Sequence, residues 1–246
     1  MEEIIAKITN WLKEETKLAN AKGLLVGVSG GLDSAVVANL IKLAFPDNSL
    51  GVVMPLKSNP IDLFDAQEVV QAAGINNITI DLTEGHHEMI KGINSVLTEK
   101  GLFNESADKI SDANLRARLR MSTLYTIASQ MNYLVVGTDN AAEWYTGYFT
   151  KYGDGGVDIQ PIIQLTKQEV RDMARLLRVP SSVIEKNPSA DLWEGQTDED
   201  EMGTSYDHID AYLEGKPIPD KDNAIIQKMH QRTEHKRTIA KQFIFR

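Results

Sequence analysis

A short stretch rich in glycine and serine, Ser29-Gly30-Gly31-Leu32-Asp33-Ser34, carries the residue types that hold phosphate groups. Glycines let backbone amides approach an anion closely, and the two serine hydroxyls add hydrogen-bond donors. The carboxylate of Asp33 would repel phosphates unless a cation lies between them. The stretch therefore predicts a phosphate-binding loop with Mg²⁺ beside it.

The segments on either side explain how this loop can be positioned. Residues 24–28 form a short apolar run flanked by turn residues, which predicts a buried strand. Apolar residues between 35 and 44 recur at helical spacing. In a strand, a glycine loop and a helix in this order, backbone amides and the positive end of the helix dipole converge on one spot.

The loop pattern differs from Gly-x-x-x-x-Gly-Lys-Ser/Thr and from Gly-x-Gly-x-x-Gly. It resembles the PP-loop of the ATP pyrophosphatases, which split ATP between the α and β phosphates and hold pyrophosphate in this loop. The alternative interpretation is a tight strand-to-helix turn that needs glycine only for its geometry. The loop by itself indicates a superfamily and leaves the substrate open.

Composition limits the class of protein further. With 246 residues, 42% hydrophobic and 25% charged, the chain is typical of a soluble globular protein with one large α/β domain. A net charge of −9 argues against a nucleic-acid partner, and the lack of cysteine excludes disulfides, thiolate zinc sites and a cysteine nucleophile. No signal peptide or membrane-spanning run is present, so we expect a cytoplasmic protein without a membrane partner.

Strand and helix patterns alternate along the chain, and the fold class that we expect is α/β, with a doubly wound parallel five-stranded sheet flanked by helices. Ligands of such sheets bind at the carboxyl ends of the strands. Further strands are predicted at 50–54, 78–82 and 133–137, and helices at 63–73, 86–98 and 112–130, with an irregular segment at 101–107.

The segment that follows the strand at 133–137 also carries polar residues. Glu143 could supply a second carboxylate for the Mg²⁺ that Asp33 implies, because Mg²⁺ takes one or two protein carboxylates and completes its shell with phosphate and water oxygens. The alternative is an acidic residue favoured at a helix start by the dipole. Considered alone, the segment favours that alternative.

Four separated motifs, in order, resemble signatures of the NAD synthetase family, and they cover nearly the whole chain. The four motifs are residues 114–121, the segment 137–162, the segment 186–199 and residues 235–237, and they follow the loop at residues 29–34. The resemblance implies a single NAD synthetase domain over residues 1–246, without a glutaminase domain.

The resemblance also implies residue roles. ATP would be bound by Gly27, Val28, Ser29, Gly30, Gly31, Leu32, Asp33, Ser34, Thr138, Lys167 and Ser189. Mg²⁺ would be bound by Asp33 and Glu143, and deamido-NAD (nicotinic acid adenine dinucleotide) by Arg118, Lys151, Asp158, His235 and Lys236. Asp33, Lys167 and Asp158 are the expected catalytic residues, with Asp158 as the hypothetical base that deprotonates ammonium.

Several of these residues have plainer interpretations. Lys167 follows the capping-box residue Thr166 and so stands near a positive helix end, but a solvated lysine also fits. His235 and Lys236 could belong to a basic tail. The acidic run 198–201 is explained by capping and the helix dipole, so we expect no catalytic role for it.

Helical spacing assigns the arginines at 116, 118 and 120 to two different faces of the helix, and it also bears on the histidine pair at 86–87. Arg118 shares a helix face with Asn114 and Tyr125, so at most part of the arginine cluster can point toward one ligand. Arg116 and Arg120 lie on a different face and are interpreted as surface or partner-helix contacts. The pair at 86–87 lacks metal-ligand spacing and is interpreted as a surface feature.

The resulting prediction is the ATP-dependent amidation of deamido-NAD with ammonia, through an acyl-adenylate, as the last step of NAD biosynthesis, by a homodimer. Three alternatives are weighed. Another PP-loop amidase would lack the two later signatures, and a tRNA-modifying enzyme would show cysteines and a basic face. A non-enzymatic ATP-binding regulator would need no pair of metal-binding carboxylates.

Overall fold

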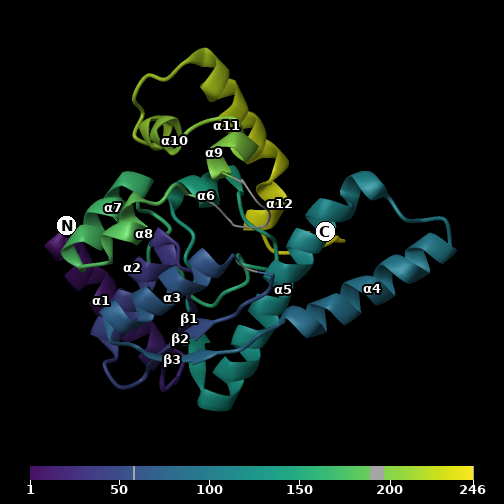
Figure 1. Ribbon diagram of the computed structural model, residues 1–246. Helices are drawn as coiled ribbons and strands as arrows, with labels where there is room; N and C mark the ends of the chain where they lie inside the picture. The colour runs from purple at the N-terminus through teal and green to yellow at the C-terminus, as the bar shows by residue number, and fades with distance from the viewer. Residues whose placement is uncertain (58, 189–196, 246) are drawn as a thin grey trace.

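The structure is a computed structural model that describes residues 1–57, 59–188 and 197–245. Its centre is a parallel sheet in the order β3-β2-β1-β4 (Figure 1). The strands are β1 (Gly23–Gly27), β2 (Ser49–Val53), β3 (Asn76–Thr79) and β4 (Tyr133–Val135). Leu24, Leu25 and Val26 in β1 are 0% exposed, as expected of a strand covered on both faces.

The sheet has four strands within the described residues, so the expectation of five is wrong. Where a fifth strand was expected, the described residues form a single isolated parallel bridge, between Val136 and Ile159. Pro161 lies two residues beyond that bridge and has no N–H to donate, so the pairing cannot continue as a regular ladder.

Helices cover both faces of the sheet. On one face lie α2 (Leu32–Ala44) and α3 (Pro60–Ala73), with α1 (Glu2–Leu18) and α7 (Lys167–Leu176) packed against α2. On the other face lies α5 (Glu105–Met131), with α4 (Thr83–Glu99) packed against it. Within the described ranges, no helix is long and apolar enough to cross a bilayer.

The start of α5 corrects a second expectation, because the helix begins at Glu105 inside the segment expected to be irregular. The side chain of Asn104 accepts a hydrogen bond from the Ser106 N–H, 3.1 Å away, and so caps the helix. This cap lies in a polar stretch without apolar periodicity, which is why the spacing argument placed the helix start seven residues too late.

The remaining helices gather beyond the carboxyl ends of the strands (Figure 1). An apolar cluster that includes Ala142, Tyr206 and Ile226 holds α6, α10 and α11 together. The helices of this region are α6 (Ala141–Thr146), α8 (Ser181–Glu185), α9 (Asp198–Met202), α10 (Tyr206–Leu213), α11 (Asp220–Arg232) and α12 (Glu234–Arg237).

The strand order creates a crevice next to β1. From β1 the chain continues to β2 and β3 on one side and then returns to place β4 on the other side of β1. The loops that leave β1 and β4 therefore separate in opposite directions, and ligands of open α/β sheets bind at such a switch point.

Candidate active site

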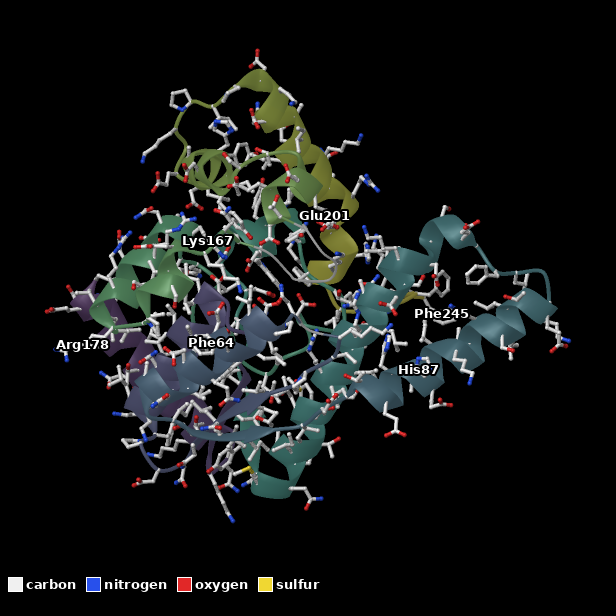
Figure 2. The ribbon with its side chains drawn as sticks, viewed as in Figure 1. Phe64, His87, Lys167, Arg178, Glu201 and Phe245 are labelled. Atoms are coloured by element: carbon white, nitrogen blue, oxygen red, sulfur yellow. The ribbon has the colours of Figure 1, made fainter. Side chains whose placement is uncertain are left out.

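A cavity of about 510 Å³ opens at this switch point. It lies between the sheet and the helices above it, in the part of the molecule where Figure 2 shows Lys167 on α7 and Glu201 on α9. The predicted site residues that line it are Gly27, Val28, Ser29, Gly31, Leu32, Asp33, Ser34, Thr138, Glu143, Lys167 and Lys236.

The loop after β1 is held in shape by its own residues. Gly30 has a φ of +86°, and a Cβ there would lie 2.6 Å from the carbonyl oxygen of Asp62, so only glycine fits. The Ser29 hydroxyl accepts from the Gly31 N–H at 3.2 Å, and the Ser34 hydroxyl donates to the Gly31 carbonyl at 2.9 Å. Glycine is thus required by the turn, and the same turn lies in the wall of the cavity.

Lys167 brings the two predicted metal-binding carboxylates together. Its Nζ lies 2.5 Å from Asp33 Oδ2 and 3.5 Å from Glu143 Oε1, and its side chain is 3% exposed. Burial by itself lowers the pKa of Lys167, but the charges of Asp33 and Glu143 outweigh burial and raise the pKa above its usual value. The solvated-lysine interpretation is therefore wrong.

Glu143 has a separate partner for each carboxylate oxygen. Oε2 accepts from the Asn140 N–H at 3.0 Å, and the Asn140 side chain accepts from the Glu143 N–H at 3.0 Å, which is a capping box. Oε1 faces Lys167. Burial, followed by the charge of Asp33, raises the pKa of Glu143 to about 7. Glu143 thus caps the start of α6 and at the same time lines the cavity beside Lys167.

The arrangement fits a shared cation. Asp33 and Glu143 contact one ammonium group, so one position lies within reach of both carboxylates. Among the described residues, seven carboxylates and five basic side chains line the cavity. A polyphosphate would be repelled by this surplus unless cations accompany it. Two carboxylates, with phosphate and water oxygens, form a typical Mg²⁺ donor set.

The residues predicted to bind deamido-NAD lie in three places: a surface cluster, the cavity wall and, for Asp158, a position apart from the cavity lining. Arg118 donates to the Lys151 carbonyl at 3.3 Å, and the Lys151 ammonium donates to the His235 carbonyl. These three residues form a cluster outside the cavity lining, called the cationic cluster after Arg118 and Lys151; Arg118 and His235 are exposed and Lys151 is half-buried. Lys236 lines the cavity, where it donates to the carbonyls of Gly147 and Phe149 at 2.8 and 2.5 Å. A free basic tail does not describe these contacts.

Asp158 lies apart from the cavity lining. Its carboxylate accepts from the Tyr125 hydroxyl at 2.9 Å and from the Val135 N–H at 2.8 Å. Arg118, Asn114 and Tyr125 each bond to the segment 150–158, as expected for residues on one face of α5. Ser189 lies outside the described residues.

The interpretation of the other arginines and of the histidine pair is wrong in three places. Arg120 lines the cavity, and burial, followed by the charge of Arg116, lowers its pKa to about 10. Arg116 is 5% exposed and pairs with Asp112 at 2.9 Å. His86 is fully buried, with Nε2 3.0 Å from Asp112. The helical spacing of residues 86, 90 and 97 was the signal for the buried histidine.

Sequence reasoning also missed an acidic and phenolic wall of the cavity. Thr197 caps α9, as expected, but Asp198 and Glu201 of the same acidic run line the cavity. The Tyr148 hydroxyl donates to Glu201 Oε2 at 2.7 Å. Asp198 accepts from the hydroxyl of Tyr206, which is 0% exposed. No periodicity marks these residues, because their contacts join segments far apart in the chain.

The parallel sheet, the glycine loop and the carboxylate pair at the switch point define a nucleotide-binding α/β protein. A sequence model of NAD synthase matches residues 4–240. The NH(3)-dependent NAD(+) synthetase of Alkaliphilus oremlandii is 58% identical over 235 residues, which cover 96% of this chain and 94% of that protein. The chain belongs to the NAD synthase family.

Solved structures show the same similarity. The NMN synthetase from Francisella tularensis has a TM-score of 0.90 and 38% identity, and the match covers 99% of this chain and 98% of that one. The NH3-dependent NAD synthetase from Campylobacter jejuni has a TM-score of 0.77 and 27% identity, with the same coverage. The helix-flanked parallel sheet is therefore shared along the full length of these proteins.

Proposed function

We propose that this chain catalyses the ATP-dependent amidation of deamido-NAD with ammonia. The nicotinate carboxylate attacks the α-phosphorus of ATP, the bond to the bridging oxygen breaks, and pyrophosphate leaves an acyl-adenylate behind. Ammonia then attacks the activated carbonyl, loses a proton and expels AMP, which gives NAD⁺. The observation that carries this proposal is the Lys167 ammonium held between Asp33 and Glu143 beside the loop at Ser29.

The residues of the cavity supply charge balance and position. Mg²⁺, held by Asp33 and Glu143, would neutralise phosphate charge when bound. Lys167 and the amides of the loop at Ser29 would donate to the departing pyrophosphate, and preset donors of this kind need no reorganisation during the reaction. Thr138 lines the same wall and would contact ATP. The resemblance also assigns Ser189, which lies outside the described residues, to ATP binding.

The second substrate would extend from the cavity toward the cationic cluster. Lys236 stands at the cavity wall, and Arg118, Lys151 and His235 lie on the surface beyond it, which gives an elongated dinucleotide several cations along its pyrophosphate. Asp158 is proposed as a dinucleotide contact. Both of its oxygens accept hydrogen bonds outside the cavity lining, which favours a dinucleotide contact over a role as the base for ammonium.

The test is an assay of purified protein with ATP, Mg²⁺, deamido-NAD and ammonium. We expect NAD⁺ and AMP in equal amounts, with pyrophosphate. Formation of ADP in place of AMP would contradict adenylation, and ATP binding without turnover would favour a regulatory ATP-binding protein.

A second candidate follows from the similarity to the Francisella tularensis NMN synthetase. An enzyme of that kind forms a mononucleotide amide, so its acceptor would be nicotinic acid mononucleotide. The two candidates differ in the acceptor and share the adenylation chemistry. Comparing kcat/KM for the two acceptors under the same conditions separates them, and a preference for the mononucleotide would replace deamido-NAD as the substrate.

We propose further that residues 1–246 act as one domain that uses free ammonia, in the cytoplasm where ATP and its co-substrate are found. We also propose a homodimer. The hairpin of α4 and α5 extends from the rest of the molecule (Figure 1), and it exposes Met89, Ile93, Val96 and Ile110. Exposed apolar side chains gathered on one projection favour a protein partner.

A further inference from the structure

Tyr206 contacts two residues of the proposed catalytic site, although it lies 63 positions from Glu143 in the sequence. It is the first residue of α10 and is fully buried. Its hydroxyl lies 3.0 Å from Glu143 Oε1 and 2.9 Å from Asp198 Oδ2. Its ring lies under Lys167, with Nζ 4.6 Å from the ring centroid.

The hydroxyl has one proton and lies within hydrogen-bond distance of both carboxylates, so it donates to one of them at a time or shares its proton between them. An ionised carboxylate only accepts hydrogen bonds, so the phenol is the donor in either contact. A phenylalanine would fill the same volume without a polar atom to bury. The hydroxyl therefore contributes a hydrogen bond to a carboxylate in addition to the packing of the ring.

That hydrogen bond bears on how Glu143 can hold a metal ion. Oε2 of Glu143 is held by the Asn140 N–H from the start of α6, and Oε1 is held by Tyr206 from α10. Because both oxygens of the Glu143 carboxylate accept hydrogen bonds, from two different helices, the carboxylate group cannot rotate freely. Each oxygen has a second lone pair, so Oε1 can accept from Tyr206 and still face a cation.

We propose that Tyr206 is a positioning residue of the active site. Its hydroxyl orients Glu143 toward the metal ion, and its ring supports the Lys167 ammonium through a cation–π contact. The inference rests on the proposed function, because it takes Glu143 as a metal ligand and Lys167 as a phosphate contact. Hydrogen-bond partners of metal ligands typically contribute 10- to 100-fold to metal affinity or activity.

The test uses Mn²⁺ in place of Mg²⁺, with ATP present, and follows free Mn²⁺ by electron paramagnetic resonance. We expect Tyr206→Phe to weaken Mn²⁺ binding roughly 10- to 100-fold, with a melting temperature close to that of the wild type. Tyr145→Phe is the matched control. It removes a hydroxyl from the same apolar cluster, and among the described residues that hydroxyl bonds to the Tyr212 hydroxyl alone, at 3.2 Å. The variant should leave Mn²⁺ affinity unchanged.

A double-mutant cycle with Glu143→Gln asks whether Tyr206 acts through Glu143. If it does, Tyr206→Phe causes little further loss of Mn²⁺ affinity once Glu143 has been replaced. Equal losses in both backgrounds would overturn the inference, and so would a Phe variant that does not fold, because the hydroxyl would then serve stability.

The outcomes separate this inference from the proposed function. A wild-type protein that neither binds Mn²⁺ with ATP nor forms NAD⁺ contradicts the proposed function itself. A wild-type protein that does both, paired with a Phe variant of unchanged Mn²⁺ affinity and unchanged kcat, overturns the role of Tyr206 alone.

Discussion

Two possible tasks of the Glu143 side chain, a helix cap and a metal ligand, are presented by the sequence as alternatives, but the structure is compatible with both at once. One oxygen completes the capping box of α6, and the other faces Lys167. A carboxylate has two oxygens with about four lone-pair positions, so a helix cap does not use up its capacity. Residue types and local spacing predicted both tasks for Glu143. They could not show that Lys167 lies beside it, because that contact depends on how α7 packs over the sheet.

The neighbouring residues His86 and His87 differ in burial, and the effect of that difference on stability can be tested. His86 is buried against Asp112, and burial lowers its pKa, with Lys57 and Arg116 acting in the same direction and Asp112 against it. In the unfolded chain the pKa is near 6.5. Between that value and the lower folded pKa, the unfolded state binds more protons, so the free energy of unfolding falls as the pH drops below 6.5.

We expect His86→Gln to remove this part of the pH dependence, while His87→Gln, at the exposed next position, keeps it. Denaturant titrations of the wild type and both variants, at several pH values on either side of 6.5, measure the effect. A difference between wild type and His86→Gln that stays constant with pH would show that His86 does not titrate on unfolding.

At the scale of elements, local patterns were most informative where the chain's own neighbours decide the structure. The apolar run 24–28 lies within one residue of β1, and the capping box of Thr166 and Glu169 starts α7 as predicted. The patterns were least informative where the structure depends on a residue far away in the chain or on the absence of a backbone N–H, as at Pro161. The fifth strand is one bridge long. The helical spacing of Tyr206, Ile209 and Leu213 indicates a buried helix face but does not show that α10 packs against α6.

The start of α6 connects helix capping to the phosphate loop, which gives a prediction at this scale. Asn140 Oδ1 caps α6 by accepting from the Glu143 N–H, and Asn140 Nδ2 donates to Asp33 Oδ1 at 3.1 Å. Aspartate caps helices as well as asparagine does. Asn140→Asp should therefore keep the cap but replace the donor to Asp33 with a second carboxylate oxygen.

We expect Asn140→Asp to lower kcat/KM for ATP by about 10- to 100-fold, because it removes a hydrogen bond to a charged group worth roughly 1.5–3 kcal/mol. Asn104→Ala is the matched control, since it removes only the cap of α5 and should cost about 1 kcal/mol of stability at unchanged kcat/KM. Steady-state kinetics and denaturant titration measure the two effects. An active Asn140→Asp protein would show that Asp33 needs no support from α6.

At the scale of the whole molecule, α4 exposes an apolar face that a second copy of the chain could cover. Met89, Ile93 and Val96 are spaced four and three residues apart on α4, so they share one helix face, and they are 46%, 44% and 56% exposed. Ile110 on α5 is 47% exposed on the same hairpin. Burying this face against a second copy would remove apolar surface from water on both chains, since the commonest dimers use the same patch twice.

Replacing Ile93 by Asp places a charge in the middle of that face, so we expect the dissociation constant of the dimer to rise at least about tenfold, because an unpaired charge is costly to bury. Sedimentation velocity over a range of concentrations measures the change. Leu18→Asp is the control, because Leu18 is 79% exposed at the end of α1, and α1 and α4 lie on opposite sides of the sheet (Figure 1). The wild type and the control should dimerise alike. A wild type that stays monomeric, or an Ile93→Asp variant that dimerises like the control, would show that another surface is used or that no dimer forms.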